Sequence, residues 1–150
     1  MRILVGLLAG VAGAVVVAPA TPAHGGEPAA RYGVAADLKT YPQGTAKEAL
    51  ASILKAIENK RIDYLLAQLA DPDWVDGRVR AYEGGFADLV KETTAKLDPP
   101  VVKRLGRFLK EGEFEALDAA AVVRLKDVKD RAVRLRRHDG RWYLQSHNKP

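Results

Sequence analysis

The chain has no cysteine and few histidines or aromatic residues. Its 150 residues include 0 Cys and 3 His, and aromatic residues make up 7% of the composition. Without cysteine the chain forms no disulfide, no Cys-ligated zinc or iron–sulfur site and no thiol nucleophile. The histidines, His24, His138 and His147, fall in an N-terminal tail, in a predicted hairpin turn and near the C-terminal end. We therefore expect no catalytic histidine, no metal site and no cofactor.

Phosphate-binding and nucleophile motifs are also missing. The sequence contains no glycine-rich phosphate loop, no dinucleotide fingerprint and no nucleophile elbow. The net charge of +5 comes from 24 Lys and Arg against 19 Asp and Glu, and nothing in their arrangement indicates specific binding of nucleic acid. A hydrophobic content of 47% is enough for one domain with one core.

The N-terminal segment has the layout of an export signal. Arg2 is followed by an apolar run, which ends in the small residues 18–23, Ala-Pro-Ala-Thr-Pro-Ala. A basic start, an apolar middle and small residues before the cleavage point are typical of a secretory signal peptide. We expect a signal peptide over residues 1–23 and export to the periplasm or the extracellular space. Cleavage after Ala20 or Gly26 and retention as a membrane anchor are alternatives, although the run is shorter than the ~20 residues of a spanning helix.

Residues 24–44 are predicted to be a linker, and residues 45–147 an α+β domain that begins with helices. Thr45 and Glu48 form a capping box at the start of the first helix. Apolar residues at helical spacing follow, first Leu50, Ile53, Leu54 and Ile57, then Ile62, Leu65, Leu66 and Leu69. Pro72 is expected to end the second helix, and residues 71–82 are expected to be irregular.

Two further helices are predicted before the pattern changes. One covers residues 86–97, and the next starts at Asp98–Pro99, an N-cap followed by a first-turn proline. Gly112 is expected to be the left-handed glycine after that helix.

The last third alternates apolar and charged residues, which is typical of strands. Asp139–Gly140 predicts a hairpin that places Leu135 opposite Leu144 and Arg136 opposite Tyr143. A turn over residues 128–130 would place Leu125 opposite Val133, and residues 114–117 could add a fourth strand. We expect an antiparallel sheet with one apolar face, covered by the helices, and one basic face.

The order of elements resembles the NTF2-like superfamily, the cone-shaped fold of SnoaL-like and ketosteroid-isomerase-like domains. The resemblance rests on residues 49–59, residues 63–75 (DYLLAQLADPDWV) and residues 133–144 (VRLRRHDGRWYL). It implies N-terminal helices packed on a curved sheet. The superfamily includes enzymes, ligand binders and scaffolds, so the resemblance alone assigns no function. In its enzymes an Asp, Tyr or His inside the cone acts on a small apolar substrate.

Four acids lie near the expected mouth of the cone. They are Asp63, Asp71, Asp73 and Asp76. We expect structural roles for them, at helix ends and in turns, and name no catalytic residue. The last three resemble the start of a calcium-binding loop, which needs an acid at position 5, glycine at position 6 and glutamate at position 12. Counted from Asp71, this chain has Val75 at position 5, its glycine one place late at Gly77, and Tyr82 at position 12, so we expect no calcium site.

Aromatic residues are the candidates for a ligand pocket. They could equally fill the core. They are Tyr64, Trp74, Phe86, Phe108 and Trp142.

Basic residues of the strands are the candidates for a surface that binds an anionic partner. They could equally keep the strands soluble. They are Arg124, Lys126, Arg134, Arg136 and Arg141.

We therefore expect an exported, non-enzymatic domain that binds a small apolar ligand or a protein partner. An isomerase- or hydratase-type enzyme with a site in the cone is one alternative. A polyanion-binding module that uses the basic face is another.

Overall fold

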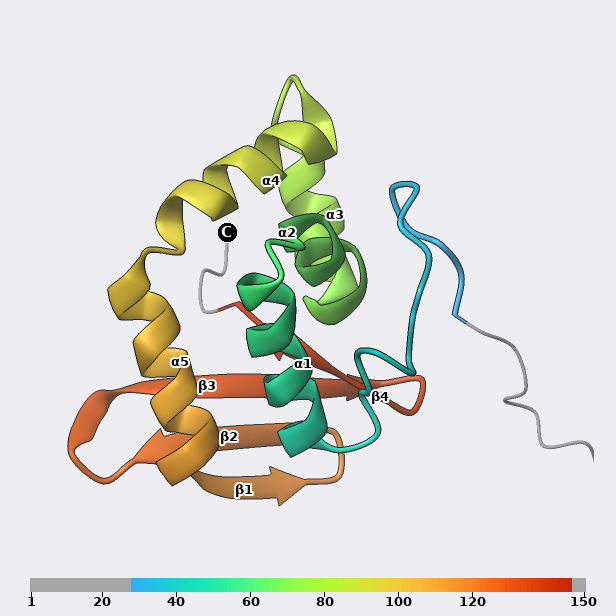
Figure 1. Cartoon of the computed structure of the whole chain (residues 1–150). Coiled ribbons are helices and arrows are strands. Elements are labelled where there is room, and N and C mark those ends of the chain that lie inside the picture. The colour runs from blue at the N-terminus through green and yellow to red at the C-terminus, as the bar shows by residue number, and fades with distance from the viewer. Residues whose placement is uncertain (1–27, 147–150) are drawn as a thin grey trace, which may run out of the picture.

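The structure is a computed structural model that describes residues 28–146 (Figure 1). The predicted signal peptide, the first residues of the predicted linker and His147 lie outside the described residues. In the described part, five α-helices are followed by a four-stranded antiparallel sheet, which confirms the α+β class. The helices are α1 (Ala46–Glu58), α2 (Ile62–Tyr64), α3 (Pro72–Arg80), α4 (Gly85–Lys96) and α5 (Pro99–Glu111), with the π-helical turn η1 (Leu65–Leu69) after α2. The strands are β1 (Glu113–Leu117), β2 (Ala120–Leu125), β3 (Val128–His138) and β4 (Arg141–Gln145).

Helix α1 begins as its sequence predicts. The Thr45 hydroxyl accepts a hydrogen bond from the Glu48 amide at 3.1 Å, and the Glu48 carboxylate accepts one from the Thr45 amide at 3.1 Å. The capping box is thus confirmed. Leu50, Ile53 and Ile57 are buried along one face of the helix, where they join the core.

The prediction that residues 71–82 are irregular is wrong, because α3 occupies most of this stretch. The Asp71 carboxylate accepts a hydrogen bond from the Asp73 amide at 3.0 Å and caps the helix. Pro72 lies in the first turn, where a missing N–H costs nothing. The proline therefore starts a helix as well as limiting the one before it.

Helices α4 and α5 agree with their predicted positions to within a few residues. The Asp98 carboxylate accepts a hydrogen bond from the Val101 amide at 3.1 Å, as expected of an N-cap. The expected role of Gly112 is wrong, because its φ of −69° is not left-handed. Close packing explains this glycine instead. A Cβ atom there would lie 2.2 Å from the Phe108 carbonyl oxygen and 2.5 Å from Val123 Cγ1.

The strands run in the order β1-β2-β3-β4. Leu135 pairs with Leu144 and Arg136 with Tyr143, which confirms the predicted register across Asp139–Gly140. These two turn residues have φ values of 47° and 74°, as a tight hairpin requires. The predicted pairing of Leu125 with Val133 is wrong. Leu125 pairs with Val128, and an irregularity between Arg124 and Leu125 shifts the register.

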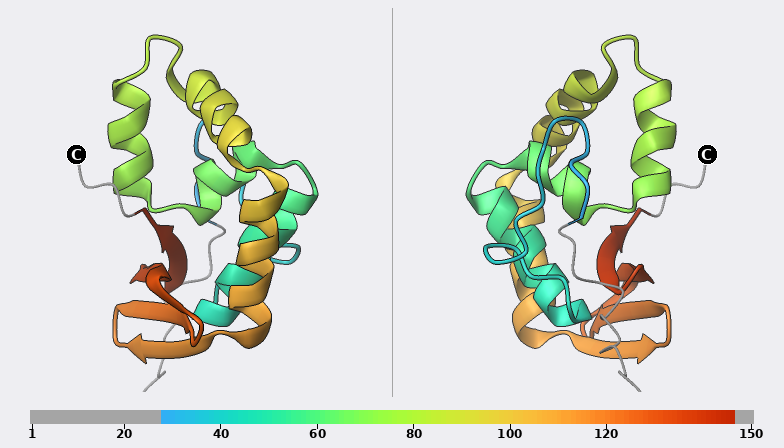
Figure 2. Two further views of the ribbon diagram at one scale, coloured as in Figure 1. Left: turned by 90° about the vertical axis from the view of Figure 1, so that its left-hand side faces the viewer. Right: turned by 90° about the vertical axis from the view of Figure 1, so that its right-hand side faces the viewer.

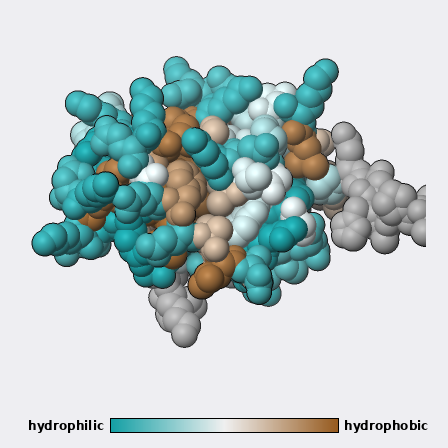
Figure 3. Space-filling model, turned by 90° about the horizontal axis from the view of Figure 1, so that it is seen from below, coloured by the Kyte–Doolittle hydropathy of each residue, from teal (hydrophilic) through white to brown (hydrophobic). Residues whose placement is uncertain are grey.

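The helices lie on one face of the sheet, and β4 rises from the sheet towards them (Figures 1 and 2). The Asp71 amide donates to the Leu144 carbonyl at 2.9 Å, which fixes the start of α3 to the end of β4. The core between the two layers includes Leu50, Ile53, Val123 and Leu135. The opposite face of the sheet is mainly hydrophilic, with smaller apolar areas between charged side chains (Figure 3).

Part of the predicted linker packs on the domain. Tyr41 and Gln43 are 4% and 2% exposed. Gln68 donates hydrogen bonds to the carbonyl oxygens of Val34 at 2.9 Å and Ala29 at 3.2 Å. These contacts hold the segment 29–43 against η1 and the end of the sheet.

Candidate functional site

An apolar cavity of about 230 Å³ lies between the helices and β4. Helix α1 contributes Ile53 and Ile57, and β4 contributes Leu144. The other lining residues come mainly from η1, α3, α4 and α5; they are Leu65, Leu66, Ala70, Trp74, Thr93, Leu97, Leu105, Gln145 and Ser146. Its walls are mainly aliphatic and aromatic, so it suits an apolar molecule.

A second hollow of about 490 Å³ adjoins the first and is more polar. Trp74, Thr93 and Ser146 line both hollows. The second hollow is otherwise lined by residues of α3 and α4 together with Ala81, namely Asp73, Gly77, Arg78, Ala81, Leu89, Glu92 and Lys96. A ligand placed across the shared residues would have an apolar environment at one end and a polar one at the other.

Two buried nitrogen donors lie at this junction without a partner. Trp74 Nε1 and Arg78 Nε have no hydrogen-bond acceptor among the described residues. The guanidinium of Arg78 is held in place, because its Nη2 donates to the Tyr82 hydroxyl at 2.8 Å and lies 3.8 Å from a Glu92 carboxylate oxygen. A buried donor without an acceptor costs about 1–3 kcal/mol. Neither nitrogen is open to solvent, so an acceptor atom of a bound molecule reaches it only when the neighbouring side chains shift.

The carboxylates beside the hollow do not suit proton transfer. A hydrogen bond from Lys96 lowers the pKa of Glu92, so this carboxylate stays ionised near neutral pH. Asp73 is exposed and lies 3.3 Å from Arg136. A general acid would need a raised pKa, and that of Glu92 is lowered.

The structure spreads the five predicted pocket aromatics over different environments. Trp74 lines both hollows. Tyr64 is buried, packs against Tyr41 with ring centroids 4.4 Å apart, and accepts a hydrogen bond from the Asp37 amide at 2.8 Å. Phe86 stacks on Tyr32, also at 4.4 Å.

The other two pocket candidates also lie away from these hollows. Trp142 is buried in the core. Phe108 is buried and lines a separate groove between α5 and β3. Of the five, Trp74 is the one that the structure places in the apolar cavity.

Most side chains of the predicted basic surface form ion pairs or hydrogen bonds with other residues of the chain. Arg124 pairs with Glu115 at 2.6 Å, and Lys126 with Glu113 at 3.2 Å. Arg136 lies 3.2 Å from Asp71, while Arg141 donates to Gln43. Arg134 also takes part in an interaction. The positive charge that an anionic partner would meet on this face is therefore reduced.

The four acids singled out in the sequence have structural contacts. Asp71 caps α3, and Asp73 lies beside Arg136. Asp63 forms a salt bridge with Arg61 at 2.9 Å, and Asp76 pairs with Arg31. The hydrogen bond from Arg61 lowers the pKa of Asp63.

Sequence reasoning missed the residues that share the hollow with Trp74. Arg78, Thr93 and Leu97 were not among the candidates. A helix starting at Asp71–Pro72 would have placed Trp74 and Arg78 on one face, four residues apart.

Neither a metal site nor a membrane-crossing helix is found in the described part of the chain. Within residues 28–146, no three His, Asp or Glu side chains cluster as metal ligands would. Over the same residues, no helix is both long enough and apolar enough to span a membrane.

Comparison with known proteins adds no assignment. Neither a family model, a curated protein nor a solved structure matches this chain. A functional conclusion must therefore rest on the geometry of the chain itself.

Proposed function

We propose that the chain is a non-enzymatic binding domain that holds a small, mainly apolar molecule between its helices and β4. The apolar body of the ligand lies against Ile57, Leu97 and Leu144. An acceptor atom at one end, such as a carbonyl, hydroxyl or carboxylate oxygen, meets Trp74 Nε1 and Arg78 Nε. An NTF2-like fold and export from the cell remain parts of this proposal.

The observation that carries the proposal is the pair of unpartnered donors beside the apolar cavity. An apolar hollow by itself is compatible with imperfect packing. Buried N–H groups in folded proteins are mostly paired with protein atoms or ordered water, so these two donors call for a partner from outside the chain. A ligand that is apolar with one acceptor would fill the cavity and satisfy these donors together.

The two alternatives have less support. An isomerase- or hydratase-type reaction needs a group with a pKa near the working pH, and the hydrogen bond from Lys96 lowers the pKa of Glu92, which makes it a weaker base. A polyanion-binding surface needs cations free to meet phosphates, and Arg124, Lys126 and Arg136 already face carboxylates.

The proposal is tested with two probes that differ by one acceptor, 1-indanone and indane. In NMR titrations, 1-indanone should move the indole N–H resonance of Trp74 downfield, because a hydrogen bond forms at Nε1. The resonance of Trp142 should stay in place as an internal control. Indane should perturb the cavity residues without this downfield shift. Mass spectrometry of the purified protein should also detect a co-purified small molecule.

A matched pair of variants locates the site. Thr93 lines both hollows, whereas the exposed Thr94 side chain donates to the Val90 carbonyl oxygen. Thr93→Phe should fill the cavity and abolish binding of both probes, while Thr94→Phe should leave it unchanged. An unmoved Trp74 resonance at millimolar 1-indanone, together with no co-purified molecule, would overturn the proposal.

A further inference from the structure

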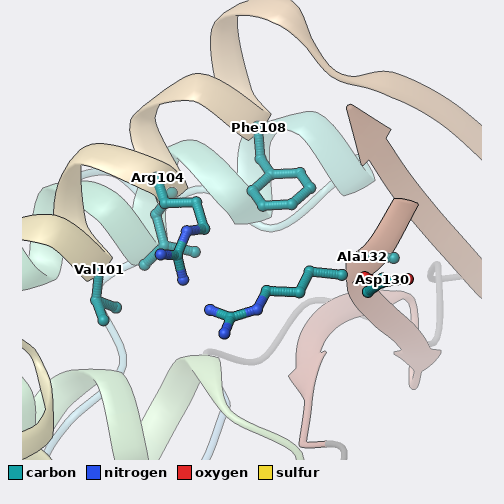
Figure 4. Close-up of a pocket in the computed structure, with 7 residues that line it drawn as sticks. Val101, Arg104, Phe108, Asp130 and Ala132 are labelled. Atoms are coloured by element: carbon teal, nitrogen blue, oxygen red, sulfur yellow. The ribbon is translucent and has the colours of Figure 1, made fainter. Parts of the chain in front are cut away.

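A separate groove of about 380 Å³ lies between α5 and the start of β3 (Figure 4). Val101, Arg104 and Phe108 project from α5 towards the groove, and Asp130 and Ala132 lie on the opposite strand (Figure 4). Leu105 and Arg131 complete the lining. The volume is within the range of small-molecule sites, about 300–1,000 Å³.

One wall of the groove is apolar. Val101, Leu105 and Phe108 follow one another at spacings of four and three residues, so they share one face of α5. Phe108 is 3% exposed, which fixes its ring in the packed interior. This wall offers a rigid apolar surface to the body of a ligand.

Two arginines face the groove from the two elements. The side chains of Arg104 and Arg131 form no ion pair or hydrogen bond with any residue in the range 28–146. Arg107, one turn further along α5, behaves differently, because it lies 2.9 Å from both Glu111 and Asp127. The nearby acids thus neutralise Arg107, whereas Arg104 and Arg131 have no ion-pair partner among the described residues. Asp130 also lines the groove, so its net charge is about one positive unit.

We propose that this groove is a second binding site, which takes a small amphipathic anion. The apolar body of the ligand packs on Leu105 and Phe108. Its acidic group, a carboxylate, sulfonate or phosphate, lies between Arg104 and Arg131. Guanidinium groups bind such oxyanions through paired N–H donors, which a single ammonium group cannot match.

The site is distinct from the cavity beside Trp74, although Leu105 lines both. The hollows beside Trp74 offer one indole N–H and one guanidinium N–H, both buried, whereas the groove offers two guanidinium groups at its edge. The two sites therefore select different ligands, and each can be tested without the other.

Two fluorescent probes with the same aromatic body provide the test. 1-Anilinonaphthalene-8-sulfonate carries a sulfonate, and N-phenyl-1-naphthylamine lacks it. The sulfonate probe should bind at least about tenfold more tightly, because hydrogen bonds between a guanidinium and an anionic oxygen are stronger than those between neutral groups. Arg104→Gln and Arg131→Gln should each weaken the sulfonate probe about tenfold and leave the neutral probe unchanged. Lys103→Gln is the matched control, because this exposed cation is adjacent in sequence but does not line the groove.

A second measurement locates the bound probe. Amide chemical shifts should change at residues 101–108 and 130–132 when the sulfonate probe binds, with the Trp74 indole resonance unmoved. Equal affinities of the wild-type protein for the two probes would overturn the proposal. So would shifts confined to α3 and α4, or a loss of affinity in Lys103→Gln equal to that in the arginine variants.

Discussion

Trp74 and Arg78 lie one turn apart on α3, and each has a buried nitrogen donor without a partner in the described structure. Both side chains line the same polar hollow, and Trp74 also lines the apolar cavity. One helical turn thus places an apolar ring and two donors at the junction of the hollows. The arrangement favours a ligand with one polar end, and it also makes a prediction about stability without ligand.

Trp74→Phe should alter the free energy of unfolding by less than about 1 kcal/mol. The variant loses part of a partly buried ring but also loses a buried donor without an acceptor, and the two effects offset each other. Trp142→Phe is the comparison, because Trp142 lies in the core and its variant should lose about 2 kcal/mol. Urea denaturation of both variants, freed of small molecules, measures the difference. Equal losses in the two variants would mean that Trp74 Nε1 carries no penalty.

Two glycines should respond in opposite ways to substitution by alanine. A Cβ at Gly112 would lie 2.5 Å from Val123 Cγ1 and closer still to the Phe108 carbonyl oxygen. Gly112→Ala should therefore cost about 1–3 kcal/mol, because α5 must move away from β2.

Gly77, inside α3, has no atom within 4 Å of where a Cβ would stand. Gly77→Ala should stabilise the domain by about 0.5–1 kcal/mol, since alanine favours the helix. Thermal and urea denaturation compare the two variants. A stabilised Gly112→Ala variant would show that the approach of α5 to β2 is looser than the structure indicates.

Local signals in the sequence predicted most elements of the fold. Thr45, Glu48 and Asp98 satisfy backbone N–H groups of their own helix ends, and Pro99 has no N–H that needs a partner, so these signals act without tertiary context. The Asp139–Gly140 turn sets the register of β3 and β4 in the same way. Asp71–Pro72 carries the same kind of signal. Reading that proline as the end of one helix hid its role as the start of α3.

The errors concern features that depend on packing between distant segments. The shift between Arg124 and Leu125 follows from how β2 meets β3, and no turn motif marks it. Gly112 is required by the Phe108 carbonyl of the preceding helix and also by the approach of Val123, and the second of these lies on another element.

The candidate site was predicted least well for the same reason. The sequence named Trp74 together with four other aromatics, and it had no means of separating a cavity wall from the core. Trp74 Nε1 has no partner because the folded chain places no acceptor near it, and the sequence alone does not show which atoms become its neighbours.

Gln68→Leu should loosen the attachment of residues 29–34 to η1. Gln68 is 1% exposed and donates to the carbonyl oxygens of Val34 and Ala29. Leucine fills similar space but donates nothing, so the Val34 amide, which bonds to the Arg31 carbonyl, should exchange with solvent at least about tenfold faster. Hydrogen–deuterium exchange with mass spectrometry measures this. Gln145→Leu, at an exposed position, is the control, and unchanged exchange in the Gln68 variant would place the attachment elsewhere.

The pKa of Asp127 should depend on Arg107. Hydrogen bonds from Arg107, with oxygens at 2.9 Å, lower the pKa of this carboxyl below its usual value of about 3.9. Because the folded-state pKa is the lower one, the contribution to stability is present above the unfolded-state pKa. It is lost as the pH falls through the folded-state pKa.

Arg107→Gln should return the pKa of Asp127 towards its usual value and reduce the loss of stability on acidification. NMR titration of the side-chain carboxyl carbons measures the pKa of Asp127 and that of a control residue, Asp63. Asp63 serves as the control, because its lowered pKa depends on Arg61 and should not respond to the change at residue 107. High salt should raise the pKa of Asp127 towards its usual value in the wild-type protein, since the Arg107–Asp127 ion pair is exposed to solvent. A titration curve of Asp127 that is the same in wild type and variant would show that Arg107 does not hold this carboxylate in solution.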